Sequence, residues 1–321
     1  MARFKFIICG DLHYRNLNPR SRLDCFQEAI DAKLREVFDL AVKTRAKAIL
    51  IPGDITDGPG IGIATLTDLA MLLQEAPCPI LTIPGNHDEF GANPASLDRT
   101  PYGLLRRLRL ITDVSSGHYY GLGDIAITGH GYDFNTDIDH GQFSFNKTGD
   151  YIKHIHMVHS MLLNKPPGFD MRHTLIDQVQ TNADIIVCGH EHVGFGVIAR
   201  DDGKIFINPG ALCRLSAHTA EMERRIQVAV ITIDGDKTKV ELVPIRCAQP
   251  GCEVLSREHI EEANAKDERM ERFLALLASE GESKFMEVKD IVTDIAEREN
   301  LPVAVKDEAL KRIGAAREQL S

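Results

Sequence analysis

The chain has 321 residues, of which 43% are hydrophobic and 26% are charged, and its formal net charge is −10. This composition is typical of a globular protein with a large core and argues against a chain that is disordered throughout. The negative charge disfavours nonspecific attraction to nucleic acids, although bound divalent cations would offset part of it.

The cysteines and the N-terminus indicate the compartment. The seven cysteines are scattered, odd in number and form no Cys-x-x-Cys pair, which is typical of reduced thiols and not of a disulfide framework. Residues 1–5 lead directly into an apolar segment and lack the apolar region of a signal peptide. No apolar run is long enough to span a bilayer. We therefore expect a cytoplasmic protein without a membrane partner.

Short apolar runs alternate with helical patterns in the first part of the chain. Apolar residues recur at helical spacing over residues 23–42, from Phe26 to Ala41. Strands separated by helices imply βαβ units with a parallel sheet. The predicted strands are 4–9, 48–52 and 79–83, and the predicted helices are 23–42 and 65–73.

The later part of the chain reads mainly as strands. Asp201-Asp202-Gly203 and Asp234-Gly235-Asp236 are typical of hairpin turns between them. We therefore expect a second sheet packed on the first, with helices outside. The predicted strands are 154–158, 185–188, 193–199, 205–207, 226–233 and 239–245.

The character of the sequence changes at Gln249-Pro250-Gly251. Residues 256–321 follow a helical pattern and contain 16 acidic and 11 basic residues. The sequence therefore predicts a catalytic domain over 1–248 and a small helical C-terminal region over 249–321.

Metal-ligand residue types follow five of the predicted strands. Because the carboxyl ends of strands in open α/β sheets face one crevice, these motifs can converge although they are far apart in sequence. Carboxylate, amide and imidazole groups without thiolate suit Mn, Fe or Zn in a catalytic site. The motifs are Asp11-Leu12-His13, Gly53-Asp54-Ile55-Thr56-Asp57, Gly85-Asn86-His87-Asp88, Val158-His159 and Gly189-His190-Glu191-His192.

This ordered set of motifs resembles the calcineurin-like metallophosphoesterase superfamily, over about residues 3–246. The resemblance implies an α/β fold, a two-sheet sandwich flanked by helices, and two divalent metal ions, with Mn²⁺ expected first and Fe or Zn as alternatives. Such ions activate a shared water and stabilise both oxygens of an in-line displacement. By the resemblance, one ion is held by Asp11, His13, Asp54 and His192, and the other by Asp54, Asn86, His159 and His190.

His87 is the motif histidine that is not needed as a metal ligand. We expect it to act as the general acid at the scissile phosphate. Asp88 is expected to hydrogen-bond His87 and set its tautomer, with capping of its own loop as the alternative. The resemblance implies that Asp57 braces its loop. His130, within Gly129-His130-Gly131, is interpreted as an ordinary loop residue.

Four arginines are candidates for substrate contacts. Arg15, Arg20 and Arg22 follow the first motif, where they are placed to bind phosphate or a nucleic-acid backbone. Arg214 follows Asn208-Pro209-Gly210-Ala211, a segment that many members of the superfamily carry beside the metals.

The long helix, the motif segments and the acidic tail resemble the nuclease subunit of the SbcCD DNA-repair complex and its phage-encoded relatives. This resemblance implies an exonuclease or phosphodiesterase acting on DNA, with an SbcC-like ATPase partner or a homodimer, and a tail that caps the substrate or docks the partner.

Two other functions are compatible with these motifs. One is a small-molecule phosphodiesterase or phosphatase that acts on a nucleotide or cyclic nucleotide. The other is a non-catalytic scaffold, which the retention of every expected ligand disfavours.

Overall fold

The structure is a computed structural model, and it describes residues 3–115, 117–146, 149, 151–258, 292–293, 295–296 and 301–318. It divides into two compact units, Met1–Ser256 and Arg257–Ser321. All the residues predicted to form the site lie in the first unit.

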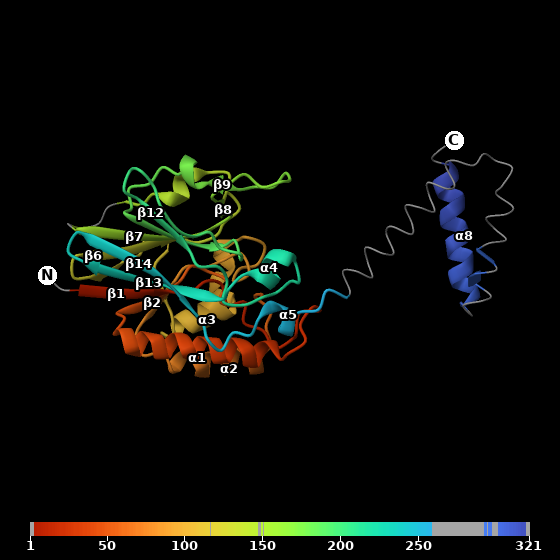
Figure 1. The fold of residues 1–321 in the computed structure, drawn as a ribbon, viewed down its shortest axis with the longest axis horizontal. Helices are drawn as coiled ribbons and strands as arrows, with labels where there is room; N and C mark the ends of the chain where they lie inside the picture. The colour runs from red at the N-terminus through yellow and green to blue at the C-terminus, as the bar shows by residue number, and fades with distance from the viewer. Residues whose placement is uncertain are drawn as a thin grey trace. The chain divides into compact units, whose positions relative to one another are not determined.

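The first sheet has six strands in the order β14-β13-β1-β2-β3-β4. Its parallel part starts from β1, to which β2, β3 and then β4 are added in sequence order. β13 and β14 extend the other edge in antiparallel orientation. The strands are β1 (Arg3–Ile8), β2 (Ala48–Ile51), β3 (Ile80–Thr82), β4 (Thr112–Asp113), β13 (Gln227–Asp234) and β14 (Lys237–Pro244) (Figure 1).

The second sheet also has six strands, in the order β11-β12-β10-β7-β6-β5. β6, β7, β10 and β12 are parallel, and β5 and β11 pair antiparallel at the two edges. The strands are β5 (Tyr120–Leu122), β6 (Ile125–His130), β7 (Lys153–Ser160), β10 (Ile185–His190), β11 (Gly196–Ala199) and β12 (Ile205–Asn208). A separate two-stranded sheet joins β8 (Leu162–Leu163) to β9 (Thr174–Leu175).

The two sheets pack face to face around an apolar layer. Alternate residues along each strand supply this layer, including Phe6 and Leu50 from the first sheet and Ile127, Met157 and Val187 from the second. Side chains on a strand point alternately to opposite faces, so the intervening residues form separate clusters on the outer faces. This arrangement confirms the predicted two-sheet α/β sandwich.

Helices cover the outer face of the first sheet, where Ile7 and Ile49 join the same cluster as Phe26 and Leu69. The outer face of the second sheet packs instead against connecting segments, which contribute Phe143 and other apolar residues. These segments contain η2 (His140–Phe143) and η3 (Ile176–Gln178). The covering helices are α1 (Phe26–Thr44), α2 (Ile63–Gln74) and α3 (Pro101–Arg107), and the remaining short helices are η1 (Pro94–Arg99), α4 (Thr219–Glu223) and α5 (Gly251–Val254).

The longest helix of the first unit begins and ends for identifiable reasons. The side-chain oxygen of Asn18 accepts a hydrogen bond of 2.8 Å from the Phe26 N–H at the start of α1. At the other end Arg45 adopts a left-handed conformation and its N–H reaches the carbonyls of Ala41 and Val42. The helix therefore starts three residues after the predicted position 23 and ends two after position 42.

β6 was not predicted from the sequence, where Gly129-His130-Gly131 was interpreted as a loop. The signal was present but short: Ile125 to Thr128 is a buried run that follows the Gly123-Asp124 turn. Gly129 sits where a Cβ would lie 2.4 Å from the Ile83 side chain, so the strand needs glycine at this close approach to the first sheet. His130 is thus the last residue of a strand.

The second unit contributes α8 (Val303–Glu318). Most of the tail for which a capping or partner-docking role is expected lies outside the described residues, so that role stays a prediction, as does the boundary at 248. In the part of the chain that is described, no helix combines the length and the apolar character needed to cross a membrane.

The packing of the two sheets predicts a specific loss of stability. Leu50→Ala, in the fully buried layer between the sheets, should lower the free energy of unfolding of the first unit by about 2–5 kcal/mol. Met71→Ala, on the exposed face of α2, should change it by less than about 0.5 kcal/mol. Urea unfolding followed by circular dichroism measures both, and equal effects of the two substitutions would contradict the sandwich core.

Candidate metal centre

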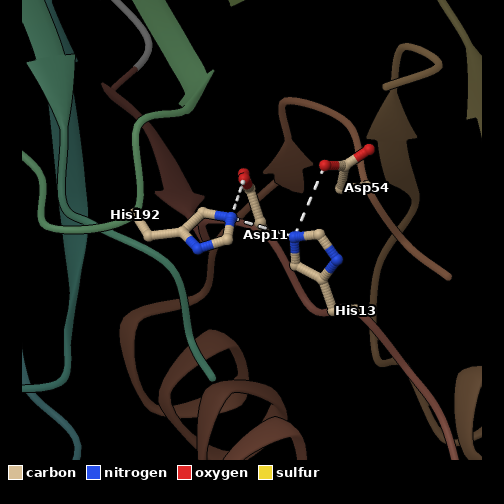
Figure 2. A group of neighbouring side chains, drawn as sticks. All are labelled: Asp11, His13, Asp54 and His192. Carbon is tan, nitrogen blue, oxygen red and sulfur yellow. Dashed lines mark hydrogen bonds and ion pairs between the residues drawn. The ribbon is translucent and has the colours of Figure 1, made fainter. Parts of the chain in front are cut away.

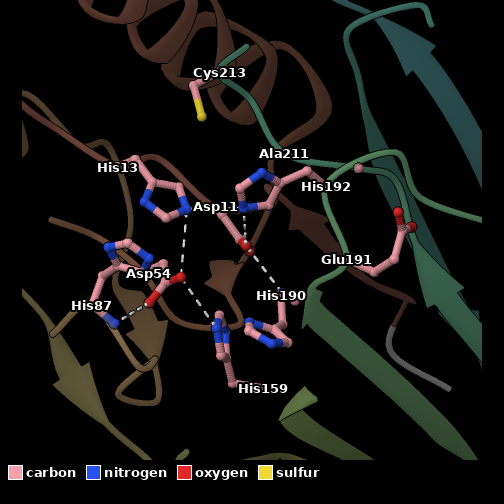
Figure 3. Close-up of polar contacts among 12 residues, drawn as sticks. Asp11, His13, Asp54, His87, His159, His190, Glu191, His192, Ala211 and Cys213 are labelled. Carbon is pink, nitrogen blue, oxygen red and sulfur yellow. Dashed lines mark hydrogen bonds and ion pairs between the residues drawn. The ribbon is translucent and has the colours of Figure 1, made fainter. Parts of the chain in front are cut away.

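Five strands from the two sheets end at one place, and their following residues form a cluster of histidines and carboxylates (Figure 3). Asp11 and His13 follow β1, Asp54 follows β2, and the Asn86-His87 segment follows β3. From the second sheet, His159 and His190 lie at the ends of β7 and β10, and His192 follows in the next loop. The convergence predicted from the motif order is what the fold produces.

One group of ligand atoms joins Asp11, His13, Asp54 and His192, all within 4.8 Å of one another. The Nε2 atoms of His13 and His192 point toward each other (Figure 2) and lie 3.0 Å apart. His13 Nε2 lies 3.4 Å from Asp54 Oδ2, and His192 Nε2 lies 3.5 Å from Asp11 Oδ2.

A second group joins Asp54, His159 and His190. His159 Nε2 lies 3.2 Å from Asp54 Oδ2 and 3.0 Å from the side-chain oxygen of Asn86. The other ring nitrogen of His159 is 2.7 Å from the Pro52 carbonyl oxygen, to which it donates. This hydrogen bond leaves Nε2 with its lone pair directed to the cluster. Asp54 is the residue that belongs to both groups.

The backbone at the site is strained. His13, Asp54 and His190 have φ angles of +44°, +50° and +81°, in the left-handed region that non-glycine residues rarely occupy. Such conformations cost free energy and persist where the surrounding structure holds them, most often at functional sites. Gly85 shows why glycine is needed beside them: a Cβ there would lie 2.1 Å from Asp54 Oδ1.

Burial and mutual charge shift the acidities of the cluster. Burial raises the pKa of Asp11 to about 6, and it lowers the pKa of His192 to about 3 with the help of neighbouring His13. Burial and the charge of His159 lower the pKa of His190 to about 3. Burial alone would raise the pKa of Asp54, but His159 and His13 outweigh it and hold that pKa well below its usual range. Burial would also lower the pKa of His159, but the Asp54 carboxylate outweighs it and raises that pKa to about 10. His190 and His192 are therefore held neutral, whereas a divalent ion would have to replace a proton on His159.

The cluster fits divalent metal ions by its own chemistry. Asp54 Oδ2 is buried and has no hydrogen-bond partner among the described residues. His13 Nε2 and His192 Nε2 face each other at a distance where two lone pairs need a cation or a proton between them. A buried carboxylate and facing nitrogens are costly unless a cation satisfies them. Oxygen and nitrogen ligands that share one carboxylate form a two-metal centre.

His87 lies at the edge of the cluster and not within either group around Asp54 that was expected to bind metal. The backbone N–H of His87 donates to Asp54 Oδ1 at 2.9 Å. The His87 ring packs edge-on against the His13 ring, with 4.6 Å between the ring centroids. Its Nδ1 lies 2.8 Å from the carbonyl oxygen of Asp57, so a proton on Nδ1 donates to that carbonyl and leaves Nε2 for proton exchange. His87 also groups with His13 and Asp57 as a third possible set of ligand atoms.

Asp88 does not orient His87, which corrects the role expected for it. The Asp88 carboxylate is fully buried and accepts hydrogen bonds from the N–H groups of Ile55, Thr56 and Gly85 and from the Thr56 hydroxyl. It therefore ties the loop after β2 to the loop after β3, which is the alternative role of loop capping. The partner of His87 is the backbone of Asp57, and no side-chain pattern in the sequence reports a backbone carbonyl.

Three of the four candidate arginines are engaged by other residues of the protein. Arg15 Nη1 pairs with Asp57 Oδ2 at 2.7 Å, and Asp57 Oδ1 lies 3.4 Å from His13 Nδ1, so Arg15 supports His13 through Asp57. The side chain of Arg22 is 1% exposed and binds Asp24 at 2.6 Å. Neither Arg22 nor Arg214 is open to a substrate in this structure. Arg20 is the exposed member of the set.

Arg214 is a structural residue. It is buried and its guanidinium donates to the carbonyls of Glu221, Arg224 and Gln249 at 2.8–3.0 Å. Burial and the charge of Arg224 lower its pKa to about 10. These contacts hold together the segment around α4 and α5, because three separate carbonyls converge on one side chain.

Three neighbours of the His190–His192 loop were not predicted from the sequence: the Glu191 carboxylate, Asn208 and Tyr132. The Glu191 carboxylate accepts from the N–H groups of Val193 and Gly194 at 3.0 and 2.6 Å. The Asn208 side chain donates to the Glu191 carbonyl at 2.9 Å. Tyr132, beyond β6, brings its ring within 5.6 Å of His190. In the sequence, only the position of Glu191 between His190 and His192 indicated that it supports this loop.

Residues 4–194 match the family model described as calcineurin-like phosphoesterase. The match spans more than half of the chain, and the protein belongs to this family. No curated protein shows significant sequence similarity to it.

Solved structures with a similar fold include two nucleotidases. The NAD nucleotidase of Haemophilus influenzae is 15% identical with a TM-score of 0.43, covering 76% of this chain and 50% of that chain. The 5′-nucleotidase precursor of Thermus thermophilus is 14% identical with a TM-score of 0.42, covering 78% and 56%. The chain thus spans about half the length of these two proteins.

A third similar structure is a dimetal phosphatase of Danio rerio. It is 12% identical with a TM-score of 0.48, and the match covers 75% of this chain and 96% of that chain.

The positions of His87 and Asp54 predict separable effects. His87→Gln should retain bound metal and lose about 10²–10⁴-fold in turnover, because it removes a proton donor without removing a ligand. Asp54→Asn should lower metal content itself, because it removes the charge common to both groups. Elemental analysis together with hydrolysis of a chromogenic phosphoester measures both. Metal loss in His87→Gln would place His87 among the ligands.

Asp88 should behave as a structural residue. Asp88→Asn places an amide donor among groups that already donate, so we expect a loss of about 1–3 kcal/mol in the free energy of unfolding. Thermal unfolding of metal-free protein checks this, with His87→Gln as the matched neighbour that should leave stability nearly unchanged. A stable Asp88→Asn protein that has lost only turnover would restore the catalytic role.

Proposed function

We propose that the protein is a two-metal phosphoesterase that acts on a small phosphoester, such as a nucleotide or a related phosphodiester. The choice of a small substrate rests on how few of the arginines that were expected to bind nucleic acid are exposed. Arg15 is 27% exposed and paired with Asp57, and Arg22 is buried, so Arg20 is the most exposed of the three.

The overall charge supports this choice. A protein that holds a nucleic-acid backbone neutralises several phosphates with lysine and arginine. The chain has a net charge of −10, and within the described loop after His13 a single exposed arginine offers such a contact. The two metal ions alone are sufficient to bind one phosphate group.

The chain's own residues have separate tasks in hydrolysis. When bound, the two ions supply an activated water and stabilise charge on the phosphate oxygens. Asp54 holds the two halves of the site together, and the Pro52 carbonyl fixes the orientation of His159. His87, held at Nδ1 by the Asp57 carbonyl, delivers a proton from Nε2 to the leaving oxygen.

The donor set guides the choice of metal. Carboxylate, amide and imidazole ligands without thiolate favour Mn²⁺, with Fe and Zn as alternatives. We therefore propose Mn²⁺ as the activating ion. Stripping the protein with a chelator should abolish activity, and Mn²⁺ should restore it better than Mg²⁺, because imidazole ligands suit Mg²⁺ poorly.

A comparison of two substrates tests the choice between a small ester and DNA. The Mn²⁺-loaded protein should hydrolyse bis(p-nitrophenyl) phosphate, and Arg20→Ala should leave that rate within about twofold because binding through the metals does not need it. Arg107→Ala, an exposed arginine on α3, is the matched control.

Single-stranded DNA in a salt series completes the test. Efficient cleavage that falls steeply with salt, and that Arg20→Ala weakens selectively, would favour the DNA nuclease over the small-molecule enzyme. Absence of hydrolysis with every metal would contradict both and favour the scaffold.

A further inference from the structure

The loop after β12 lies beside the metal centre, and Figure 3 shows its Ala211 next to His192. Residues 211–213 of this loop are all buried. The Ala211 N–H donates to the His192 carbonyl at 2.9 Å. The Leu212 N–H donates to the Asp11 carbonyl, also at 2.9 Å. The 211–213 segment is therefore hydrogen-bonded to the backbone of two candidate metal ligands.

The three carbonyls of the same segment all accept hydrogen bonds from buried cationic side chains. Arg224 donates from Nη1 to the Ala211 carbonyl at 2.8 Å and from Nη2 to the Cys213 carbonyl. Lys33, on α1, donates from Nζ to the Leu212 carbonyl at 3.2 Å. We call Arg224, Lys33 and the 211–213 segment the backbone clamp. Both sides of the segment are fixed, the carbonyls by the two cations and two of the N–H groups by the candidate ligands.

The chemistry of Arg224 suits this task. Its buried side chain pairs with the buried Glu221 carboxylate, with 2.7 Å between Nε and Oε1. A buried ion pair contributes little net stability compared with apolar residues of similar volume, because both charges lose their hydration. A guanidinium, however, offers donors in a fixed planar fork. Arg224 can therefore bind one carboxylate and two carbonyls at once and hold them in a defined geometry.

The backbone clamp reaches one of the two candidate metal groups. Asp11 and His192 belong to one group of ligand atoms, and the clamp holds their backbone. His159 and His190 belong to the other group. His159 is held instead by the Pro52 carbonyl, and His190 is part of β10. Within the described part of the chain, neither of these two histidines is hydrogen-bonded to the clamp.

We propose that Arg224 and Lys33 are positioning residues for one of the two metal ions. They act through the 211–213 segment, which fixes the backbone of Asp11 and His192. This inference rests on the proposed two-metal site and states which half of it the clamp serves. Neither residue contacts the ions or the substrate. Loss of an outer hydrogen-bonding partner of metal ligands typically weakens metal binding by about 10–100-fold.

Arg224→Lys tests the proposal by Mn²⁺ binding. Lysine keeps a positive charge opposite Glu221, but one ammonium group cannot reproduce the fork that reaches two carbonyls and a carboxylate. In a calorimetric titration the chelator-treated parent should bind two Mn²⁺ ions. Arg224→Lys should weaken one of the two binding steps by about 10–100-fold and leave the other within about twofold. Lys33→Met should weaken the same step by less, because it releases one carbonyl.

Electron paramagnetic resonance and a second background identify the affected ion. With two equivalents of Mn²⁺, the parent should show the signal of a coupled Mn²⁺ pair, and Arg224→Lys should show that of a single Mn²⁺. In a His192→Ala background, which already lacks a ligand of the supported ion, Arg224→Lys should cause little further loss of binding. In a His159→Ala background it should still weaken the ion that remains.

Arg200→Lys is the matched control. The Arg200 guanidinium also donates to two carbonyls, those of Ile176 and Val179, and pairs with the Asp202 carboxylate. These contacts lie away from the metal centre, so Arg200→Lys should leave both Mn²⁺ binding steps within about twofold. Thermal unfolding of each metal-free variant verifies that it folds, and Lys33→Met carries the test if Arg224→Lys does not.

The possible results separate this inference from the proposed function. Two ions bound equally tightly by the parent, Arg224→Lys and Lys33→Met would overturn the positioning role alone. Equal weakening of both steps, or the same loss in Arg200→Lys, would also overturn it, because the residue would then support the fold in general. A parent protein that binds no Mn²⁺ would overturn the two-metal site itself, and the parent titration shows this without any variant.

Discussion

Asp54 is the carboxylate on which the arrangement of the site depends. It is 1% exposed, it belongs to both groups of ligand atoms, and one of its oxygens lacks a hydrogen-bond partner among the described residues. A buried carboxylate in this state is unfavourable unless cations satisfy it. Asp54 also has a left-handed backbone conformation, which costs further free energy. Both costs accompany the placement of one negative charge between histidines from the two sheets. Metal binding would turn this local instability into affinity.

The strained loops stay in place because buried polar groups tie them to one another. Asp88 joins the loop after β2 to the loop after β3, and Glu191 with Asn208 closes the loop after β10. The Leu212 N–H reaches the Asp11 carbonyl at 2.9 Å, which links the first loop to the segment beyond β12. These contacts are almost all between a side chain and the backbone or within the backbone. They position the ligands before any metal arrives, which is the condition for electrostatic stabilisation in a rigid site.

The arginines show how tertiary structure changes the meaning of a sequence pattern. Three arginines in one loop suggest a basic surface, but Arg15 neutralises Asp57 behind His13 and Arg22 is buried beside Asp24 and Phe26. Arginines paired in this way stabilise the loop and are not available to bind a polyanion. What remains exposed in that loop is Arg20.

The sequence alone determined the fold family and the candidate ligands, because both depend on local order: an apolar strand followed at once by Asp, Asn or His. It also located most strands and the long helix α1 through their periodicity. It did not locate β6, because the strand ends in Gly129 and His130 between two glycines, a composition more typical of a loop than of a strand. Tertiary structure decided which polar partner each residue finds, so Asp88 binds the backbone of Thr56, the Asp57 carbonyl orients His87, and Arg214 is buried. Spacing in the sequence records where a side chain leaves the strand, whereas its hydrogen-bond partners depend on loops that meet only after the two sheets have packed.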